Sequence, residues 1–359
     1  MPAREALIRA RRIVVKIGSR ALAENPTVQG QLAGEVAALS LEGRTFVLVS
    51  SGAIAIGIKR LGYRRRPREI SKLQAAAAAG QSELMRKYDE VFSRHGVPTA
   101  QVLLTHADLS DRERLNNARQ ALAELIDAGA VPIVNENDTV STEEIRFGDN
   151  DQLAAMVTPL VGADLLVLLT DVVGVLDEQQ KRIPVMTGSA RIGNFAKDDK
   201  VGTGGIASKV EAAWKGGRAG AHAIIAPASQ PGVLGSILAG ADIGTLFPAH
   251  GSALRARKHW IAYTLRPRGA VLLDAGATEA LREGRSSLLP IGVLGVRGQF
   301  NPGDAVSLVG PDGTEVGRGL TRLGALDLAR TARKKRPEVE RLLGSTDVVV
   351  VHKDDLVVE

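Results

Sequence analysis

Short, almost continuously apolar runs alternate with helical stretches over roughly the first 250 residues of the chain. Ile13–Ile17 reads IVVKI and Thr45–Val49 reads TFVLV, and between them Thr27–Leu41 has apolar residues at helical spacing. A longer helical region follows at Glu69–Arg94. Further candidate strands lie at 99–104, 131–134, 165–169 and 223–226. Strands that are apolar on both faces are typical of a parallel sheet covered by helices on both sides. The sequence therefore predicts an α/β fold, a three-layer αβα sandwich with a mostly parallel sheet.

The pattern changes around Ala249–Arg268, a stretch rich in lysine and arginine. No acidic residue occurs between Asp242 and Asp274. From Val271 onward the chain has short strand-like runs and frequent Gly and Pro turns. A segment of about 90 residues is long enough to fold by itself. We therefore expect two domains, residues 1–264 and a smaller β-rich domain at 265–359.

Composition excludes several classes of site. The chain has 359 residues and no cysteine, so disulfides, thiolate catalysis and Cys-ligated zinc are excluded, and its six histidines are scattered. No stretch approaches the roughly 18 apolar residues that a membrane helix needs, and the N-terminus lacks a signal-peptide core. We therefore expect a cytoplasmic protein with no membrane partner. The formal charge of +6 is compatible with nucleic acid or with anionic small molecules as ligands.

Small or polar clusters follow the candidate strands. Because ligands of open α/β sheets bind at the carboxyl ends of the strands, these clusters together predict the rim of an active site. They are Lys16–Ser19, Ser50–Ala55, Asn135–Asp138, Gly148–Asp151, Thr170–Asp171 and Gly202–Lys209.

Two of these clusters have the glycine-rich sequences SSGAIA and GTGGIASK, each opening a helical stretch. Glycine lets backbone N–H groups approach oxyanions, and the helix adds its positive N-terminal dipole. Neither a Walker-type GxxxxGK[ST] nor a GxGxxG at the first strand is present. Lys16 ends an apolar strand, where an unpaired buried charge is costly. Snorkelling to solvent is the alternative, but the following Gly-Ser favours a phosphate partner. Lys209 taken alone is equally compatible with a solvated first helical turn.

The aspartates Asp138, Asp149 and Asp151 could ligate Mg²⁺, orient lysines or bind a substrate ammonium group. Turn formation and helix N-capping are the alternatives, and for Asp149 capping is favoured equally because GDND directly precedes an apolar helical stretch. Ser51 could be a capping residue, a nucleophile or a substrate contact. Its surroundings lack the GxSxG pattern, so an acyl-enzyme triad is disfavoured.

Taken together, these motifs resemble those of the glutamate 5-kinases, a family of the amino-acid kinase superfamily. The resemblance rests on VVKIGS, VSSGAIAIG, LLTHADLSDRERLNNAR, VPIVNENDTVSTEEI, FGDNDQLAA, LLLTD and GTGGIASK. The tail is similar to the PUA domain of that family in DAGATEALREGRSSLLPIGV and GQFNPGDAV. The match covers nearly the whole chain in the family's order, and the pairing of NEND with GDND is its most specific part.

The resemblance implies ATP-dependent phosphorylation of the γ-carboxylate of L-glutamate to L-glutamyl 5-phosphate, the first step of proline biosynthesis. The catalytic positions it implies are Lys16, Lys209 and Asp151. The glutamate-binding positions it implies are Ser51, Gly52, Ala53, Asn135, Asp138 and Asn150. The ATP-binding positions it implies are Lys16, Gly18, Ser19, Thr170, Asp171, Thr203, Gly204, Gly205, Ile206, Ala207, Ser208 and Lys209. It implies no metal site in the protein itself, because Mg²⁺ is held mainly through the ATP phosphates.

This chemistry suits the residues present. A γ-carboxylate has a reference pKa near 4.3 and is already an ionised nucleophile at neutral pH, so no general base is needed. The task is to stabilise charge as one anion meets a triphosphate, which calls for lysines, backbone N–H groups and Mg²⁺. We expect Lys16 and Lys209 to flank the transferring phosphoryl group, with Asp151 between them.

The chain departs from the family's pattern after Asp171. It has Gly174–Asp177 (GVLD) without the expected tyrosine, in a segment that looks shortened. The sequence therefore does not indicate which residues contact adenine. The basic stretches Arg64–Arg68 and Arg255–Arg268 match no motif.

Two alternatives remain. The first is another enzyme of the superfamily, such as acetylglutamate, aspartate, carbamate or uridylate kinase. The second is an RNA-binding PUA protein, which is disfavoured because residues 275–359 contain 12 Lys plus Arg against 12 Asp plus Glu. The resemblance also suggests a homo-oligomer (dimer or tetramer), feedback inhibition by proline and hand-over of the product to glutamyl phosphate reductase.

Overall fold

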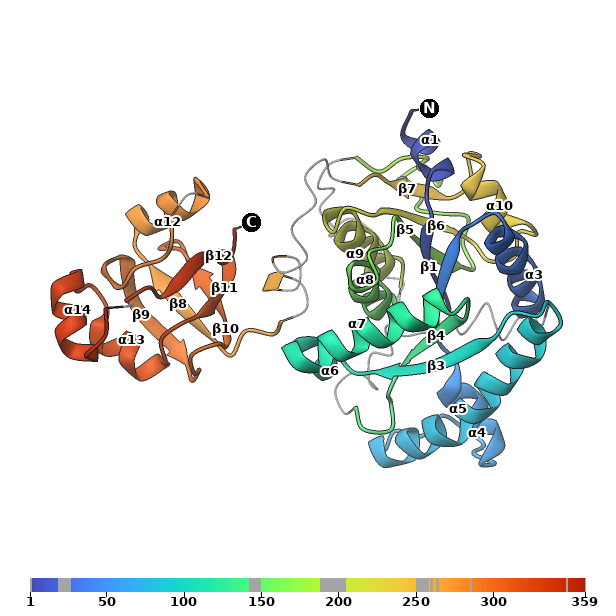
Figure 1. Ribbon diagram of the computed structural model, residues 1–359, viewed down its shortest axis with the longest axis horizontal. Helices are drawn as coiled ribbons and strands as arrows, with labels where there is room; N and C mark the ends of the chain where they lie inside the picture. The colour runs from blue at the N-terminus through green and yellow to red at the C-terminus, as the bar shows by residue number, and fades with distance from the viewer. Residues whose placement is uncertain are drawn as a thin grey trace. The chain divides into compact units, whose positions relative to one another are not determined.

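The computed structural model describes residues 2–18, 27–141, 150–187, 205–249, 258, 261–262, 265–284, 286–346 and 348–358. Contacts divide the chain into two compact units, Met1–Ala253 and Leu254–Glu359 (Figure 1). The domain boundary at 264/265 stays a prediction.

The first unit is built on a seven-stranded sheet in the order β3-β4-β2-β1-β5-β6-β7. Neighbouring strands are parallel except for β6 and β7, which are antiparallel. The strands are β1 (Arg12–Ile17), β2 (Thr45–Ser50), β3 (Thr99–Leu104), β4 (Val131–Glu136), β5 (Leu165–Thr170), β6 (His222–Pro227) and β7 (Thr245–Phe247). Six of them form where the apolar runs predict strands, and the short β7 is an addition.

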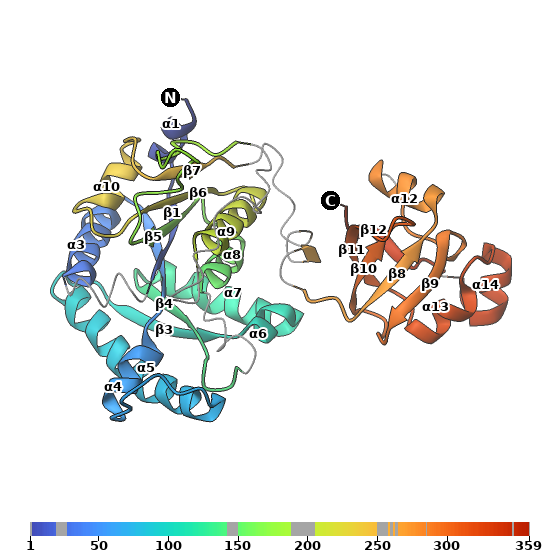
Figure 2. The same cartoon turned by 180° about the vertical axis from the view of Figure 1, so that it is seen from behind.

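Helices cover both faces of this sheet, which confirms the predicted three-layer arrangement (Figures 1 and 2). One face carries α1 (Pro2–Ile8), α3 (Val28–Leu41), α5 (Ile70–Ser93) and α10 (Val233–Leu238), with α4 (Ala53–Arg60) packed on α5. The other face carries α6 (His106–Ser110), α7 (Arg112–Asp127), α8 (Asn150–Leu160) and α9 (Ile206–Arg218).

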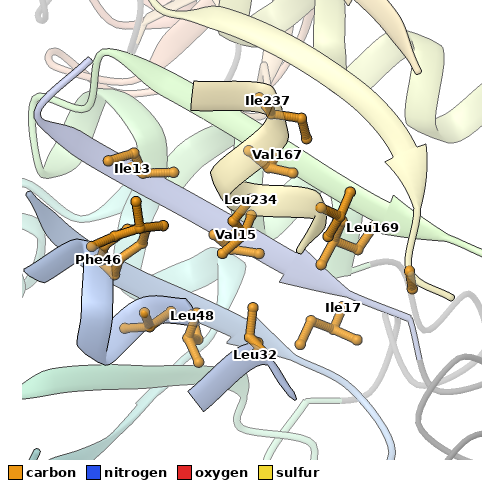
Figure 3. Close-up of a cluster of buried hydrophobic side chains, with 14 of the residues drawn as sticks. Ile13, Val15, Ile17, Leu32, Phe46, Leu48, Val167, Leu169, Leu234 and Ile237 are labelled. Atoms are coloured by element: carbon orange, nitrogen blue, oxygen red, sulfur yellow. The ribbon is translucent and has the colours of Figure 1, made fainter. Parts of the chain in front are cut away.

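Alternation along β1 distributes its side chains between these two layers. Ile13, Val15 and Ile17 point into the core shared with α3 and α10 (Figure 3). Val14 packs into the opposite core, shared with α8 and α9. Because side chains alternate with a period of two, Lys16 lies on the same face as Val14. The fold thus directs this lysine toward α8.

The sheet order makes the carboxyl end of β1 the natural place for a ligand. β1 lies between β2 and β5. The strands β2 to β4 lie on one side of β1, and the strands β5 to β7 lie on the other side. In open α/β sheets a crevice forms where the winding reverses. The ends of β1, β2, β4 and β5 border this point.

Helices α4 and α5 approach each other backbone to backbone. A Cβ on Gly57 would lie 1.7 Å from the carbonyl oxygen of Ala76, and one on Gly80 would lie 1.8 Å from that of Ala53. Only glycine fits at both positions. The alanine-rich segment of α5 therefore holds α4, and with it the turn that precedes α4, in a fixed position.

The second unit is built on a five-stranded sheet in the order β12-β11-β10-β8-β9, which agrees with a small β-rich domain. Its pairs are antiparallel except β8 with β10. The elements are β8 (Gly269–Leu273), α12 (Ala275–Arg282), η3 (Pro290–Gly292), β9 (Val293–Gly298), β10 (Ala305–Val309), β11 (Glu315–Thr321), α13 (Ala325–Thr331), α14 (Arg336–Leu343) and β12 (Val351–Val358). Its core includes Val271, Leu273, Val306, Leu308 and Val351.

Candidate active site

Three charged side chains meet beneath the carboxyl end of β1. Lys16 comes from β1, Asp151 is the second residue of α8, and Lys209 lies in the first turns of α9. Lys16 Nζ lies 2.5 Å from Asp151 Oδ1, and Lys209 Nζ lies 2.9 Å from Asp151 Oδ2. The Asp151 side chain has no exposed surface, and both lysine side chains are less than a tenth exposed. The structure therefore brings the three predicted catalytic residues into one buried cluster.

The electrostatics of this cluster keep Asp151 ionised. Burial acts to raise the pKa of its carboxyl group, but the charges of Lys16 and Lys209 and their hydrogen bonds outweigh it, so the pKa lies below its ordinary value. With both lysines charged, the three side chains together carry a charge of +1. Such a cluster at the end of a buried strand suits an anionic ligand.

A second cluster consists of amide and hydroxyl groups from β2, β4 and α8. Asn150 Nδ2 lies 2.5 Å from the carbonyl oxygen of Ser50, 2.9 Å from Ser51 Oγ and 2.9 Å from Asn135 Oδ1. Asn135 and Asn150 are both buried. Three of the predicted glutamate-binding residues, Ser51, Asn135 and Asn150, are thus directly connected. Because Asn150 precedes Asp151, the lysine cluster and the amide cluster meet at the start of α8.

The turn between β2 and α4 depends on glycine. Gly52 has φ of 111° and is the N-cap of α4, whose first residue is Ala53. This left-handed backbone is readily adopted by glycine alone. Among the described residues no side chain caps α4, and the first N–H groups of a helix can face an anion. Both predicted contacts, Gly52 and Ala53, belong to this helix start.

The predicted nucleotide positions gather at the ends of β1 and β5 and at the start of α9. Thr170 Oγ1 donates to Asp171 Oδ1 at 2.9 Å. Gly18 directly follows β1 and is half-buried. Gly205 is the N-cap of α9, and Ile206, Ala207 and Ser208 form the first turn.

The structure does not describe all of the predicted positions. Ser19, Asp149, Thr203 and Gly204 lie outside the described residues, as does half of Arg255–Arg268. Asp138 is half-buried in the turn after β4. The side chains of Arg64–Arg68 are mostly exposed.

The segment after Asp171 forms a short hairpin attached to β7. The buried Thr245 hydroxyl accepts a hydrogen bond from Val175 N at 2.8 Å and donates one to Ile183 O at 2.7 Å. Arg182 adds an ion pair with Asp242 at 2.8 Å. One threonine thus joins both arms of the hairpin, which explains how the segment keeps a defined shape without the expected tyrosine.

Sequence reasoning missed two glutamines of the site region. Gln81 Oε1 accepts a hydrogen bond from Asn135 Nδ2 at 2.9 Å. Gln152, next to Asp151, has Oε1 at 2.5 Å from Lys215 Nζ. The available signal for Gln81 was its spacing of seven residues from Gln74 in an otherwise alanine-rich helix, which places both amides on one face.

Two findings on the described residues concern metal ligands and membrane-spanning helices. Among the described residues, no three His, Cys, Asp or Glu side chains converge as metal ligands. No helix in the described part of the chain is both long and apolar enough to span a membrane.

Comparison with known proteins places the chain in a family. Residues 11–226 match the Amino acid kinase family, and residues 269–343 match the PUA domain. The chain is 46% identical to a glutamate 5-kinase of Trichlorobacter lovleyi, over 99% of this chain and 98% of that one. It is 43% identical to one of Pelobacter propionicus and 44% identical to one of Burkholderia vietnamiensis, each over 99% of both chains.

Among solved structures, the chain resembles N-acetylglutamate synthase from Neisseria gonorrhoeae in complex with coenzyme A and N-acetyl-glutamate. The TM-score is 0.53 at 18% identity, over 70% of this chain and 62% of that chain. At this identity the likeness supports the fold alone. The relatives and the family matches decide the rest: the chain belongs to the amino acid kinase family and, within it, to the glutamate 5-kinases.

Proposed function

We propose that this protein transfers the γ-phosphoryl group of ATP to the γ-carboxylate of L-glutamate, giving L-glutamyl 5-phosphate and ADP, the first step of proline biosynthesis. The observation that carries the proposal is the buried Lys16–Asp151–Lys209 cluster, next to the amide cluster around Asn150. The relatives that match 99% of this chain are named glutamate 5-kinase, which supports the same reaction.

The acceptor needs binding rather than activation. Its γ-carboxylate is ionised at neutral pH and attacks the γ-phosphorus directly, so the new O–P bond forms while the bond to the ADP oxygen breaks. We assign Ser51, Asn135, Asp138 and Asn150, with the N–H groups at Gly52 and Ala53, to hold the amino acid. Donors would face its carboxylates, and Asp138 supplies an acceptor for its ammonium group.

The two lysines would stabilise the charge that spreads over the phosphoryl oxygens during transfer. Asp151 holds both ammonium groups, at 2.5 and 2.9 Å, so they are positioned before the substrates arrive. Prepositioned charge of this kind requires no reorganisation during the reaction. Mg²⁺ bound to the nucleotide phosphates would supply further charge neutralisation there. Gly18, Thr170, Asp171 and the start of α9 are assigned to the nucleotide.

The proposal is tested by incubating the protein with ATP, Mg²⁺ and L-glutamate in the presence of hydroxylamine, which traps an acyl phosphate as the hydroxamate. ADP release is measured in parallel with N-acetylglutamate, aspartate and UMP as acceptors. We expect hydroxamate with glutamate and little ADP release with the other three. Failure to form hydroxamate from glutamate, or faster ADP release with another acceptor, would contradict the proposal.

A further inference from the structure

Helix α5 presents two glutamines to the segment that follows β4. Gln74 Nε2 donates to the carbonyl oxygen of Ser141 at 3.2 Å, and Gln81 bonds to Asn135 at 2.9 Å. Ala77 lies between them on the same helical face and is buried. Gly80, directly before Gln81, touches the start of α4. The position of Gln81 is therefore fixed by the helix contact that also fixes the Ser51–Ala53 turn.

Backbone groups determine how the linked side-chain amides of Asn150, Asn135 and Gln81 are oriented. Asn150 faces the carbonyl oxygen of Ser50, which can only accept, so Asn150 presents its Nδ2 there. The N–H of Glu136 donates to Asn135 at 2.9 Å, so the Asn135 atom facing it is Oδ1. Asn135 Nδ2 then points to Gln81, which must present its oxygen. The opposite orientation of Gln81 would set two NH₂ groups against each other.

The consequence is that the NH₂ group of Gln81 faces away from Asn135. Its Nε2 is buried and has no hydrogen-bond partner among the described residues. A buried donor without an acceptor is unfavourable, and such groups in folded proteins call for an explanation. A donor on a side chain that contacts the amide cluster through Asn135 suits a ligand that carries carboxylate oxygens.

We propose that Gln81 is an acceptor-binding residue: its Oε1 fixes the orientation of Asn135, and its Nε2 donates to a carboxylate oxygen of the amino-acid substrate. This inference rests on the proposed function, because it takes the amide cluster as the acceptor site. It adds a contact from α5 to the contacts from β2, β4 and α8. It also gives a reason for a glutamine at position 81 of the alanine-rich helix α5, where it bonds to Asn135.

The two roles of Gln81 can be separated by substitution. Gln81→Glu has the same shape and keeps an oxygen for Asn135 Nδ2, but it replaces the donor by a negatively charged acceptor. Gln81→Met has a similar length and removes both interactions. We expect Gln81→Glu to raise KM for glutamate about tenfold or more, the loss typical of one hydrogen bond to a charged group, while KM for ATP stays within about twofold. Gln81→Met should raise KM for glutamate at least tenfold as well.

The measurement is steady-state kinetics by ADP release, with each substrate varied in turn, on variants whose thermal unfolding midpoints match the wild type. Glu83→Gln, a substitution at an exposed ion pair of the same helix, is the matched control and should behave as wild type. Unchanged KM for glutamate in Gln81→Glu would overturn the inference, as would a parallel rise in KM for ATP. If Gln81→Glu fails to fold, an unchanged KM for glutamate in Gln81→Met overturns the inference. Absence of hydroxamate with the wild-type protein would instead mean that the proposed function fails.

Discussion

At the scale of single residues, the site depends on one carboxylate that is shared by two lysines. Asp151 is fully buried, and each of its oxygens faces a different ammonium group. Removing one partner of a buried ionic cluster leaves the other charges uncompensated. This destabilises a protein more than replacing the whole cluster by apolar residues. We therefore expect both the proposed chemistry and the stability of the core to depend on Asp151.

We predict that Asp151→Asn lowers kcat/KM by about a hundredfold or more, because the lysines lose the charge that positions them. The same change should destabilise the protein by about 3 kcal/mol, since two buried ammonium groups lose their counter-ion. Kinetics and urea unfolding check both effects. Asp89→Asn, at an exposed position of α5, is the control. A variant with near-normal turnover would show that Asp151 does not position the lysines.

The lowered pKa of Asp151 gives this stabilisation a defined pH dependence. Between the ordinary pKa of about 3.8 and the lower native value, the unfolded chain binds a proton that the native protein does not. The stability from Asp151 is therefore complete above about pH 4 to 5 and declines as pH falls through the native pKa. We expect the gap in unfolding free energy between wild type and Asp151→Asn to stay constant from pH 5 to 8 and to shrink below about pH 4. A gap that persists unchanged in acid would rule this out.

At the scale of elements, the α4–α5 contact connects helix packing to the proposed acceptor site. Gly80→Ala would force a Cβ to within 1.8 Å of the Ala53 carbonyl oxygen, and backbone cannot move aside as a side chain can. We predict a loss of about 1–3 kcal/mol in stability together with a higher KM for glutamate, because α4 carries the Ser51–Ala53 turn.

The control for this substitution is Gly30→Ala. A Cβ on Gly30 meets nothing within 4 Å, and both glycines lie in helices, so both variants gain similar helix propensity. Gly30→Ala should be neutral or stabilising by up to about 1 kcal/mol. Thermal and urea unfolding of both variants, with KM for each substrate, separate the effect of the clash with Ala53 from the effect of helix propensity. Equal stability of the two would show that α4 and α5 can part without strain.

The elements also mark what sequence can and cannot reveal. Runs such as Ile13–Ile17 predict strands because burial on both faces leaves a local signature. The described parts of the polar clusters after them lie at one edge of the sheet, since strand order places the strand ends together, and their role as the rim of an active site stays a prediction. β7 is three residues long and too short for such a pattern. The contact between Gln81 and Asn135 joins residues 54 positions apart, and no local pattern specifies that partner.

At the scale of the whole molecule, the surplus of positive charge lies in residues 1–274, and the part of it at Arg255–Arg268 belongs to the C-terminal unit. Residues 275–359 are electrically balanced, and in α14 Arg336 pairs with Glu340 at 2.7 Å while Lys334, just before it, pairs with Glu338. Balanced surfaces of this kind bind phosphate backbones weakly.

We therefore predict that the full-length protein shows no tight binding to RNA, and that what binding occurs is lost between about 50 and 200 mM salt. Filter binding at both salt concentrations, with a double-stranded and a single-stranded RNA, measures this. Glutamate-dependent ADP release by the same preparation is the control for a folded protein. A tight complex that survives the higher salt would revive RNA as a partner.

The alternation along β1 makes catalytic activity a test of strand register. Lys16 reaches Asp151 only because it shares a face with Val14, while its neighbours Val15 and Ile17 point into the opposite core. A slip of one residue would turn Lys16 into the apolar layer and expel Val15 and Ile17 from it. No molecule with a shifted central strand could therefore be both folded and active, so the activity of a refolded sample counts the chains whose central strand is correctly aligned.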